Sequence, residues 1–285
     1  MKKLTLLMAL CLFLVQAATA QEKMSCCVKP ASNEATTQFA MLANDKSFVE
    51  KHENPLPFTL QNQAGKTITY KTPDGKTASA YEIKAAKETD NYLFVIHEWW
   101  GLNDYIKQEA ERLHGELGDV NVIALDLYDG KVAEAREQAM EYMQAVDNER
   151  AKAIIQGVIN HVGSDADIAT IGWCFGGGWS LQTALLAGDQ AEAAVIYYGM
   201  PERDVERLKK LEAPVLGIFA KQDGSITPEI VRDFEAKMKE ADKDVTIKMY
   251  DAVHAFANPS NPKYDKEAAE DANKLAVEFI REHLD

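Results

Sequence analysis

The pattern of apolar and polar residues divides the chain into three parts. Residues 4–15 form an apolar run, residues 21–54 are mainly polar, and residues 55–285 carry short apolar runs separated by helical patterns. No Gly-, Pro- or Ser-rich linker interrupts the third part, so we expect a single domain preceded by an extension. The extension contains one weak helical stretch whose apolar residues share a face, namely Phe39, Leu42 and Val49.

The third part begins with alternating runs that predict an antiparallel meander. The expected strands of this meander cover residues 58–61, 67–71 and 79–84. From residue 92 strands and helices alternate, which predicts an α/β fold with a mostly parallel central sheet and helices on both faces. The expected strands are 92–97, 120–125, 168–173, 193–198, 215–219 and 245–250, and the helical segments are 103–117, 132–161, 177–187, 228–241 and 265–284.

The N-terminus has the features of a Sec-type secretory signal peptide. Lys2 and Lys3 precede the apolar run, and small residues follow up to Ala20, where we expect cleavage. An uncleaved anchor is the alternative, but this run of 12 residues falls short of the roughly 20 apolar residues that span a bilayer. We therefore expect a periplasmic or secreted protein that has no membrane span after cleavage.

The acidic composition of the chain makes some classes of binding partner unfavourable. Asp and Glu number 45 against 31 Lys and Arg, which gives a formal net charge of −14. This sign repels phosphate backbones and anionic membrane surfaces, so nucleic acid is not an expected partner. The 46% of hydrophobic residues supply a sizeable core.

Cysteine usage indicates a fold that does not depend on disulfides. Cys11 would leave with the signal peptide, and the remaining three cysteines are too few for a disulfide scaffold. The adjacent Cys26 and Cys27 could form a vicinal disulfide, an intermolecular bridge or an inert pair, and the sequence leaves these open. We expect no zinc there, because neither a His nor a second Cys pair lies at ligand spacing nearby.

The most informative motif is Gly172-Trp173-Cys174-Phe175-Gly176, where an expected strand meets an expected helix. It matches the nucleophile elbow G-x-S-x-G with Cys in place of Ser. Such a turn places the sulfur at a helix N-terminus, whose partial positive charge favours a thiolate. A small buried cysteine beside a Gly-rich helix start is the alternative interpretation.

Two further residues follow strand ends in the order expected of an α/β-hydrolase, which is nucleophile, acid and then His. Asp223 follows the strand at 215–219, and His254 follows the strand at 245–250. His254 would accept the thiol proton, and Asp223 would orient its imidazole. Asp251 is a rival acid, although it lies in the same loop as His254.

Several segments together resemble the dienelactone hydrolase family over roughly residues 55 to 285. The matching segments are His97 to Asn103, Asp126-Leu127-Tyr128, the Cys174 elbow, Tyr197-Tyr198-Gly199 and His254-Ala255-Phe256. The resemblance implies an α/β-hydrolase fold and a Cys-His-Asp triad that cleaves enol-lactones and related esters. It assigns catalytic roles to Cys174, His254, Asp223 and Glu98, with Glu98 helping to generate the thiolate once substrate binds. It also implies an oxyanion hole formed by the backbone amides of Trp99 and Phe175.

Departures from the family's pattern concern the substrate. Members that cleave dienelactones hold the substrate carboxylate with two arginines, where this chain has Lys131 near the first position and Asn258 at the second. Lys131 lacks the bidentate fork of arginine. Trp100 and Phe256 add apolar surface beside the expected site, so we expect Trp100, Lys131, Phe256 and Asn258 to contact a different, neutral acyl substrate. Arg203 is another candidate cation.

The sequence thus favours an exported hydrolase of small esters or lactones that acts through a thioester on Cys174, without metal or cofactor. The alternative is a catalytically silent α/β-hydrolase scaffold that binds a ligand. A small-molecule substrate is the expected partner. We expect a monomer, and a dimer is the open alternative.

Overall fold

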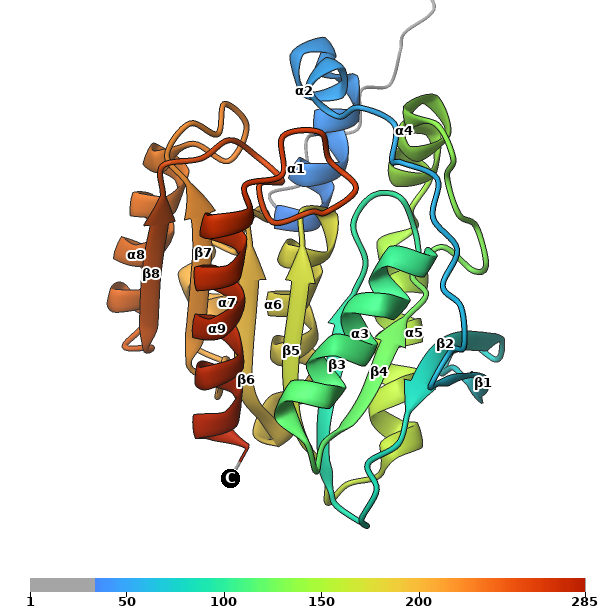
Figure 1. Cartoon of the computed structure of the whole chain (residues 1–285). Coiled ribbons are helices and arrows are strands. Elements are labelled where there is room, and N and C mark those ends of the chain that lie inside the picture. Colours follow the sequence, from blue (N-terminus) through green and yellow to red (C-terminus); the bar gives the residue numbers. More distant parts are fainter. Residues whose placement is uncertain (1–33, 285) are drawn as a thin grey trace, which may run out of the picture. The chain divides into compact units, whose positions relative to one another are not determined.

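The computed structural model describes residues 34–284. The predicted signal peptide, Cys11, Cys26 and Cys27 lie outside these residues. The described residues belong to one compact unit, Ser32–Asp285, whose centre is an eight-stranded sheet in the order β1-β2-β4-β3-β5-β6-β7-β8 (Figure 1). The strands are β1 Lys66–Lys71, β2 Thr77–Ile83, β3 Asn91–Ile96, β4 Asn121–Leu125, β5 Asp167–Trp173, β6 Ala191–Tyr197, β7 Val215–Ala220 and β8 Val245–Tyr250.

Six adjacent strands, β4-β3-β5-β6-β7-β8, run parallel, whereas β2 is antiparallel to both of its neighbours, β1 and β4. The predicted α/β fold with a mostly parallel sheet and an antiparallel N-terminal part is therefore confirmed. Parallel pairing has a consequence for function: the carboxyl ends of β3, β5, β6, β7 and β8 all meet at one edge of the sheet.

The predicted strand at residues 58–61 is wrong. This segment forms no ladder, and the backbone N–H of Leu60 donates to the Asp104 carboxylate at 3.1 Å. Pro55 and Pro57 lack the N–H that a ladder needs, and the Phe58 side chain is exposed. The antiparallel part is thus the hairpin β1-β2 joined to β4.

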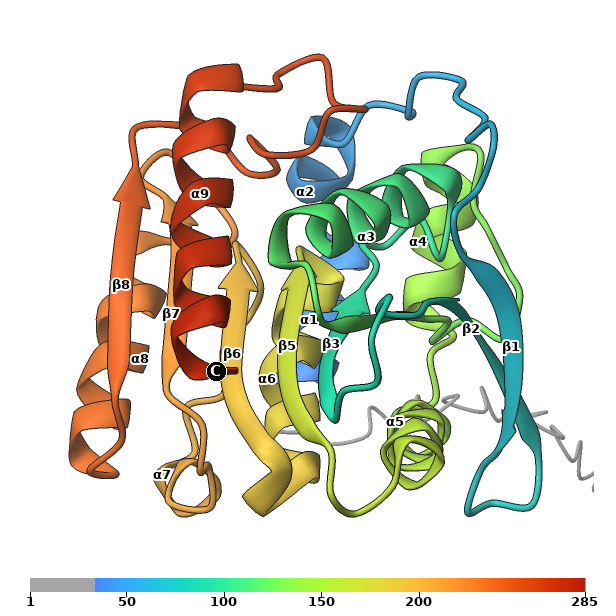
Figure 2. The ribbon, with the colours of Figure 1, turned by 60° about the horizontal axis from the view of Figure 1, so that its bottom comes forward.

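Helices cover both faces of the sheet, as Figures 1 and 2 show. One face carries α3 and α9, and the other carries α5, α6 and α8. The helices that follow the meander are α3 Asp104–Leu117, α4 Arg136–Gln144, α5 Asn148–Val162, α6 Phe175–Ala187, α7 Val205–Leu208, α8 Pro228–Glu240 and α9 Lys266–His283. The short α7 was not predicted. Among the helices of residues 34–284, none has the length and apolar character that a bilayer crossing requires.

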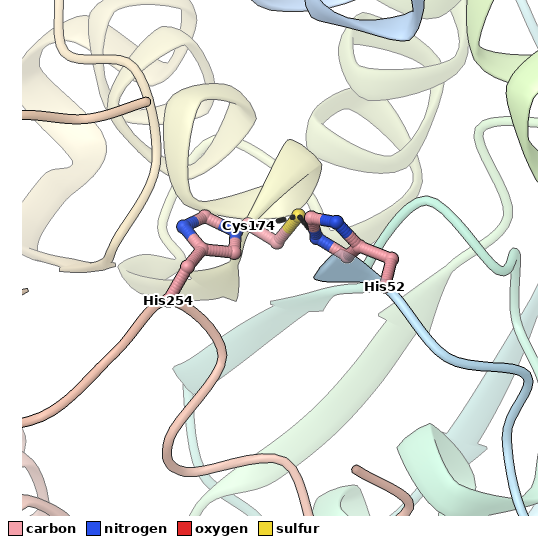
Figure 3. A group of neighbouring side chains, drawn as sticks. All are labelled: His52, Cys174 and His254. Atoms are coloured by element: carbon pink, nitrogen blue, oxygen red, sulfur yellow. Dashed lines mark hydrogen bonds between the residues drawn. The ribbon is translucent and has the colours of Figure 1, made fainter. Parts of the chain in front are cut away.

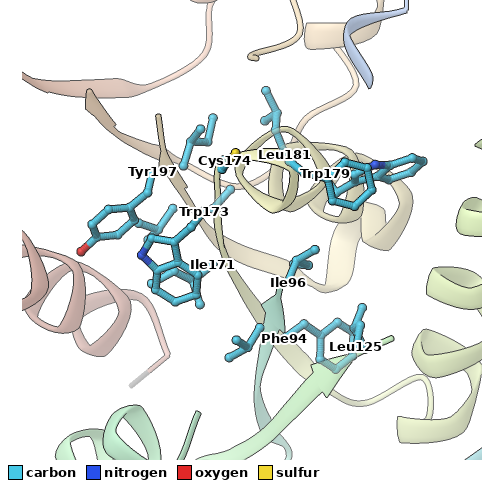
Figure 4. Packing of buried hydrophobic residues seen from close by; sticks show 14 of the residues in the cluster. Phe94, Ile96, Leu125, Ile171, Trp173, Cys174, Trp179, Leu181 and Tyr197 are labelled. Atoms are coloured by element: carbon cyan, nitrogen blue, oxygen red, sulfur yellow. The ribbon is translucent and has the colours of Figure 1, made fainter. Parts of the chain in front are cut away.

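The core lies between the sheet and its two helical layers. Strands β4 and β7 are buried at every position, whereas the edge strand β8 alternates between exposed and half-buried residues. Strands covered on both faces read as continuous apolar runs, which explains why they are the clearest in the sequence. Figure 4 shows Ile171, Trp173 and Tyr197 near Cys174, so buried side chains of the core support the elbow.

Before the hairpin, residues 35–52 form a segment that we call the capping segment. It contains α1 Ala35–Met41, a 3₁₀ turn Leu42–Asn44 and α2 Lys46–Lys51, and it lies above the carboxyl edge of the sheet in Figure 1. Phe39 and Phe48 are buried, and Leu42 and Val49 pack partly buried against the core. Each buried Phe contributes roughly 1.5–3 kcal/mol, so the described part of the extension is packed onto the domain.

Candidate active site

The nucleophile elbow has the backbone conformation that the motif predicts. Cys174 joins β5 to α6 with φ +56° and ψ −116°, a conformation that costs a non-glycine residue on the order of 1–3 kcal/mol. A Cβ on Gly172 would collide with the Gly176 carbonyl, and one on Gly176 would collide with the backbone of Ile96. The two glycines therefore allow the turn to pack against β3, and the strained turn lifts the sulfur beyond the strand end.

His254 lies between Cys174 and Asp223. Its Nε2 is 3.4 Å from the Cys174 sulfur, and its Nδ1 is 2.6 Å from Asp223 Oδ2. The other Asp223 oxygen accepts the backbone N–H groups of Ser225 and Ile226, which fixes the carboxylate. The rival acid, Asp251, accepts a hydrogen bond from Gln222 instead.

Burial and charge act in opposite directions on these three groups. Burial raises the pKa of the Asp223 carboxyl, but His254 and two backbone N–H groups outweigh it and hold this pKa below its usual range. Burial lowers the pKa of His254, but the Asp223 carboxylate raises it well above the ordinary value. Burial raises the pKa of the Cys174 thiol, so the thiol form is favoured at rest.

Glu98 is a buried carboxyl directly after β3. Burial raises its pKa to about 7, although Asn258, whose Nδ2 donates to Oε2, acts to lower it. His97 beside it is fully buried; its Nδ1 donates to the Glu98 carbonyl and its Nε2 accepts the Leu127 N–H. The backbone that carries Glu98 is therefore held in place, and the carboxyl titrates near neutrality.

A small cavity of about 50 Å³ adjoins this carboxyl. Glu98, Trp100, Trp173 and Asn258 line it, together with residues of α3. Two residues expected to contact substrate, Trp100 and Asn258, thus lie at one cavity with Glu98.

The other two expected substrate contacts, Lys131 and Phe256, do not line this cavity. Phe256 is buried against the rings of Tyr198 and Tyr250 and does not line this cavity. Lys131 is exposed, with its ammonium 5.3 Å from the centre of the Tyr142 ring. Arg203, the other candidate cation, donates to Gln38 of the capping segment at 2.7 Å.

The residues expected to form an oxyanion hole follow two adjacent strands. Trp99 is buried after β3, and Phe175 is the first residue of α6. The Phe175 backbone N–H acts on the sulfur and lowers the pKa of the thiol, against the larger effect of burial. This orientation is the one that an amide at a helix N-terminus gives.

His52 was not singled out from the sequence. Its Nε2 lies 4.0 Å from the Cys174 sulfur, and its Nδ1 is 2.7 Å from the Phe48 carbonyl oxygen. Figure 3 shows the sulfur between the imidazoles of His52 and His254. Burial, and then the charge of His254, lower the pKa of His52 to about 3, so its ring is neutral. No motif marks a lone His at the end of a short helix, and the contact arises only from packing of the capping segment.

Comparison with known proteins identifies the family. The model of the dienelactone hydrolase family matches residues 79–284. Protein usf of Aquifex pyrophilus is 31% identical over 205 residues, which cover 67% of this chain and 88% of that protein. Carboxymethylenebutenolidase 1 of Cupriavidus pinatubonensis is 24% identical over 220 residues, which cover 72% of this chain and 92% of that protein.

Solved structures agree at the level of the fold. A dienelactone hydrolase-like promiscuous phosphotriesterase from metagenomic libraries aligns with a TM-score of 0.67 and 20% identity, covering 78% of this chain and all of that one. An esterase of Pyrococcus furiosus aligns with a TM-score of 0.61 and 13% identity, covering 82% of this chain and all of that one. The fold, the family model and the relatives lead to one conclusion: the chain belongs to the dienelactone hydrolase family of α/β-hydrolases, and it is an enzyme of the ester- and lactone-hydrolase class.

Proposed function

We propose that this protein is an exported hydrolase of small, neutral esters or lactones that uses a Cys174-His254-Asp223 triad and a thioester intermediate. The observation that carries the proposal is the position of His254, hydrogen-bonded to Asp223 on one side and 3.4 Å from the Cys174 sulfur on the other. A nucleophile, a base and a group that orients the base are the parts that acyl transfer requires.

The first half of the reaction forms the thioester. The Cys174 sulfur attacks the carbonyl carbon of the substrate while His254 Nε2 takes the thiol proton, and Asp223 stabilises the resulting imidazolium. The Trp99 and Phe175 backbone N–H groups donate to the oxyanion of the tetrahedral intermediate. The carbon–oxygen bond of the ester then breaks, and the leaving alkoxide takes the proton from His254. With a lactone this alkoxide stays attached to the acyl group.

The second half consumes water. His254 removes a proton from a water molecule, and the oxygen of that water attacks the thioester carbon. The carbon–sulfur bond breaks, the acid is released, and the thiolate recovers its proton from His254. No oxidation state changes in either half.

Glu98 adjusts the charge around the thiol. In its ionised form this carboxylate raises the pKa of Cys174, and with its own pKa raised to about 7 it is neutral in part of the protein. A neutral Glu98 removes the repulsion that a developing thiolate meets. This supports a role for Glu98 in forming the thiolate once substrate is bound.

The surroundings favour a neutral acyl group. Asn258 is neutral and donates to Glu98, and the Lys131 ammonium lies over Tyr142 and not at the cavity beside Trp100, so neither residue supplies a positive charge there. A substrate carboxylate would therefore lack charge-assisted hydrogen bonds worth on the order of 1.5–3 kcal/mol each.

Hydrolysis of a panel of neutral esters and lactones, each matched with a carboxylate-bearing analogue, tests the proposal. We expect higher kcat/KM for the neutral member of each pair, and no turnover by Cys174→Ala. A preference for the anionic members would contradict the substrate class, and wild-type rates in Cys174→Ala would contradict the mechanism.

A silent binding scaffold is the alternative, and the close cover of Cys174 by the capping segment is the observation that favours it. Alkylation of Cys174 by iodoacetamide separates the two. A thiol that reacts, and that a substrate analogue protects, supports the hydrolase. An inert thiol in a protein without turnover supports the scaffold.

Export rests on residues 1–20. Fractionation of cells that express the full chain, with mass determination of the product, tests it. Protein that begins at Gln21 outside the cytoplasm is expected, and an intact N-terminus in the cytoplasm would contradict it.

A further inference from the structure

Three metal-ligating side chains converge at the elbow from three separate parts of the chain. His52 ends the capping segment, Cys174 begins α6 and His254 follows β8. Their ligand atoms, one sulfur and two imidazole nitrogens, all lie within 4.8 Å of one another (Figure 3). We propose that His52, Cys174 and His254 form a binding site for one thiophilic metal ion of the Zn²⁺ class, and that an ion bound there blocks the nucleophile.

The spacing of the donor atoms fits such an ion. Tetrahedral Zn²⁺ with bonds of about 2.3 Å to sulfur and about 2.1 Å to nitrogen holds neighbouring donors roughly 3.3–3.6 Å apart. The sulfur lies 3.4 Å from His254 Nε2 and 4.0 Å from His52 Nε2. The third pair of donors, the two imidazole nitrogens, lies within 4.8 Å. A tetrahedral ion therefore requires the His52 ring to move toward the sulfur, and a fourth ligand from outside these three residues.

The hydrogen bonds that the two imidazoles make through Nδ1 have the same kinds of acceptor as those of metal-ligating histidines. His254 Nδ1 donates to Asp223 at 2.6 Å, and His52 Nδ1 donates to the Phe48 carbonyl at 2.7 Å. A proton held on Nδ1 leaves Nε2 as the coordinating atom, and both Nε2 atoms face the sulfur. Ligating histidines almost always donate their second N–H to a carboxylate or a backbone carbonyl in this way.

The donor set selects the class of metal. One thiolate and two imidazoles suit Zn²⁺ and copper ions, whereas Mg²⁺ and Ca²⁺ prefer oxygen ligands. The rings of Phe48 and Trp99 pack against His52 and shield the site from bulk water. The site also departs from the sequence-based expectation of no metal, because His52 reaches the sulfur only through the packing of the capping segment.

Binding would form bonds from the ion to Sγ and to both Nε2 atoms, and would release to solvent the Cys174 proton and the proton that His254 Nε2 carries in its imidazolium form, without any change of oxidation state. With its electron pair on the metal, the sulfur cannot attack a carbonyl carbon, and His254 Nε2 cannot accept a proton. This inhibitory effect rests on the proposed function, whereas the binding site itself does not.

Calorimetric titration of the chelator-treated full chain with Zn²⁺ tests the site, and Co²⁺ provides a spectroscopic probe through thiolate-to-cobalt charge transfer. We expect one ion per chain and a thiolate–cobalt band. His52→Asn and Cys174→Ser should each weaken binding by more than about 10-fold. His161→Asn, which changes an exposed histidine on α5, is the matched control and should bind like the wild type. Circular dichroism checks the fold of every variant, and His52→Gln replaces His52→Asn if the latter unfolds.

Hydrolysis measured in the same titration separates the two proposals. We expect activity to fall in step with Zn²⁺ occupancy, and the inhibition constant to rise in His52→Asn by the same factor as the dissociation constant. Absence of one-to-one binding, or equal affinity in His52→Asn and wild type, would overturn the site. Binding that leaves activity unchanged or raises it would overturn the blocking effect. Stoichiometric binding to a protein without any hydrolysis would support the site while the proposed function fails.

Discussion

Two neighbouring imidazoles, with ring centres 5.1 Å apart, face the same sulfur, and they differ in which hydrogen-bond acceptor holds each ring. His254 and His52 both turn Nε2 toward Cys174, at 3.4 and 4.0 Å, and both donate through Nδ1. The acceptor behind His254 is the Asp223 carboxylate, whereas the acceptor behind His52 is the neutral carbonyl of Phe48. Only the first acceptor carries a charge that stabilises an imidazolium.

This difference sends the two pKa values in opposite directions. Burial acts against the charged form of both rings, but the Asp223 carboxylate outweighs it at His254, whose pKa lies well above the ordinary value. At His52 burial prevails, and the pKa falls to about 3. Closeness to a nucleophile is therefore not sufficient for a general base. The ring must also have a partner that stabilises it once it has taken the proton.

The largest expected effect comes from exchanging one imidazole at a time. His254→Asn should lower kcat/KM on the order of 10⁶-fold, because it removes the base, whereas His52→Asn should change the metal-free rate less than about 10-fold. Steady-state kinetics of an ester in the presence of a chelator measures both. Equal losses in the two variants would mean that both rings take part in proton transfer.

The carboxylate behind His254 should matter next. Asp223→Asn should lower kcat on the order of 10⁴-fold through a misoriented imidazole that is less able to carry charge. Asp251→Asn is the matched control, since Asp251 bonds to Gln222 and not to either histidine. The reverse ranking of these two variants would show that Asp251 is the acid of the triad.

Acid should lower the free energy of unfolding through His52, the last residue of the capping segment. Its pKa is near 6.5 when unfolded and about 3 when folded, so the unfolded chain binds more protons between these values and stability falls as the pH drops from 6.5 toward 3. At pH 4.5 this loss is about 2–3 kcal/mol relative to pH 7. Denaturant unfolding at both pH values should therefore show a smaller loss in His52→Asn, with a chelator present throughout. An identical loss in variant and wild type would refute the buried neutral ring.

The pH dependence of stability that Glu98 contributes should have the opposite sign to that of His52. Its pKa rises from 4.5 unfolded to about 7 folded, so the folded chain binds more protons between these values and stability falls as the pH rises through this window. Glu98→Gln removes the buried charge and should gain on the order of 1–3 kcal/mol over wild type at pH 8, but little at pH 4.5. A constant difference across this range would contradict the raised pKa.

Much of the fold could be predicted because buried parallel strands are visible in the sequence as apolar runs. The segment that forms β7 is apolar throughout, the segment that forms β5 is apolar after Asp167 except at Thr170, and the glycines around Cys174 mark a turn that few other residues could make. Chain order then placed Asp223 and His254 at neighbouring strand ends. The short run at residues 58–61 failed because apolar alternation does not reveal whether a strand has a neighbour to pair with.

The rest of the site depends on contacts between distant segments. His52 approaches Cys174 only because Phe48 and Phe39 bury α1 and α2 against the domain, and nothing in their short helical pattern says where they dock. Lys131 and Phe256 both follow motif segments of the family, which is why we expected them to contact substrate. In the structure, however, Lys131 packs against Tyr142, and Phe256 packs against Tyr198 and Tyr250. Local patterns identify which residues follow a strand, whereas side-chain direction depends on the packing of the complete fold.

Trapping the acyl-enzyme tests the central claim most directly. The full chain is mixed with 4-nitrophenyl acetate, quenched in acid within the first turnover, digested and analysed by mass spectrometry. We predict an acetyl group on the peptide that carries Cys174, removable by neutral hydroxylamine as a thioester is, and its absence in Cys174→Ala. Acetylation of a different residue, or hydrolysis at the wild-type rate in Cys174→Ala, would contradict the assignment of Cys174 as the nucleophile.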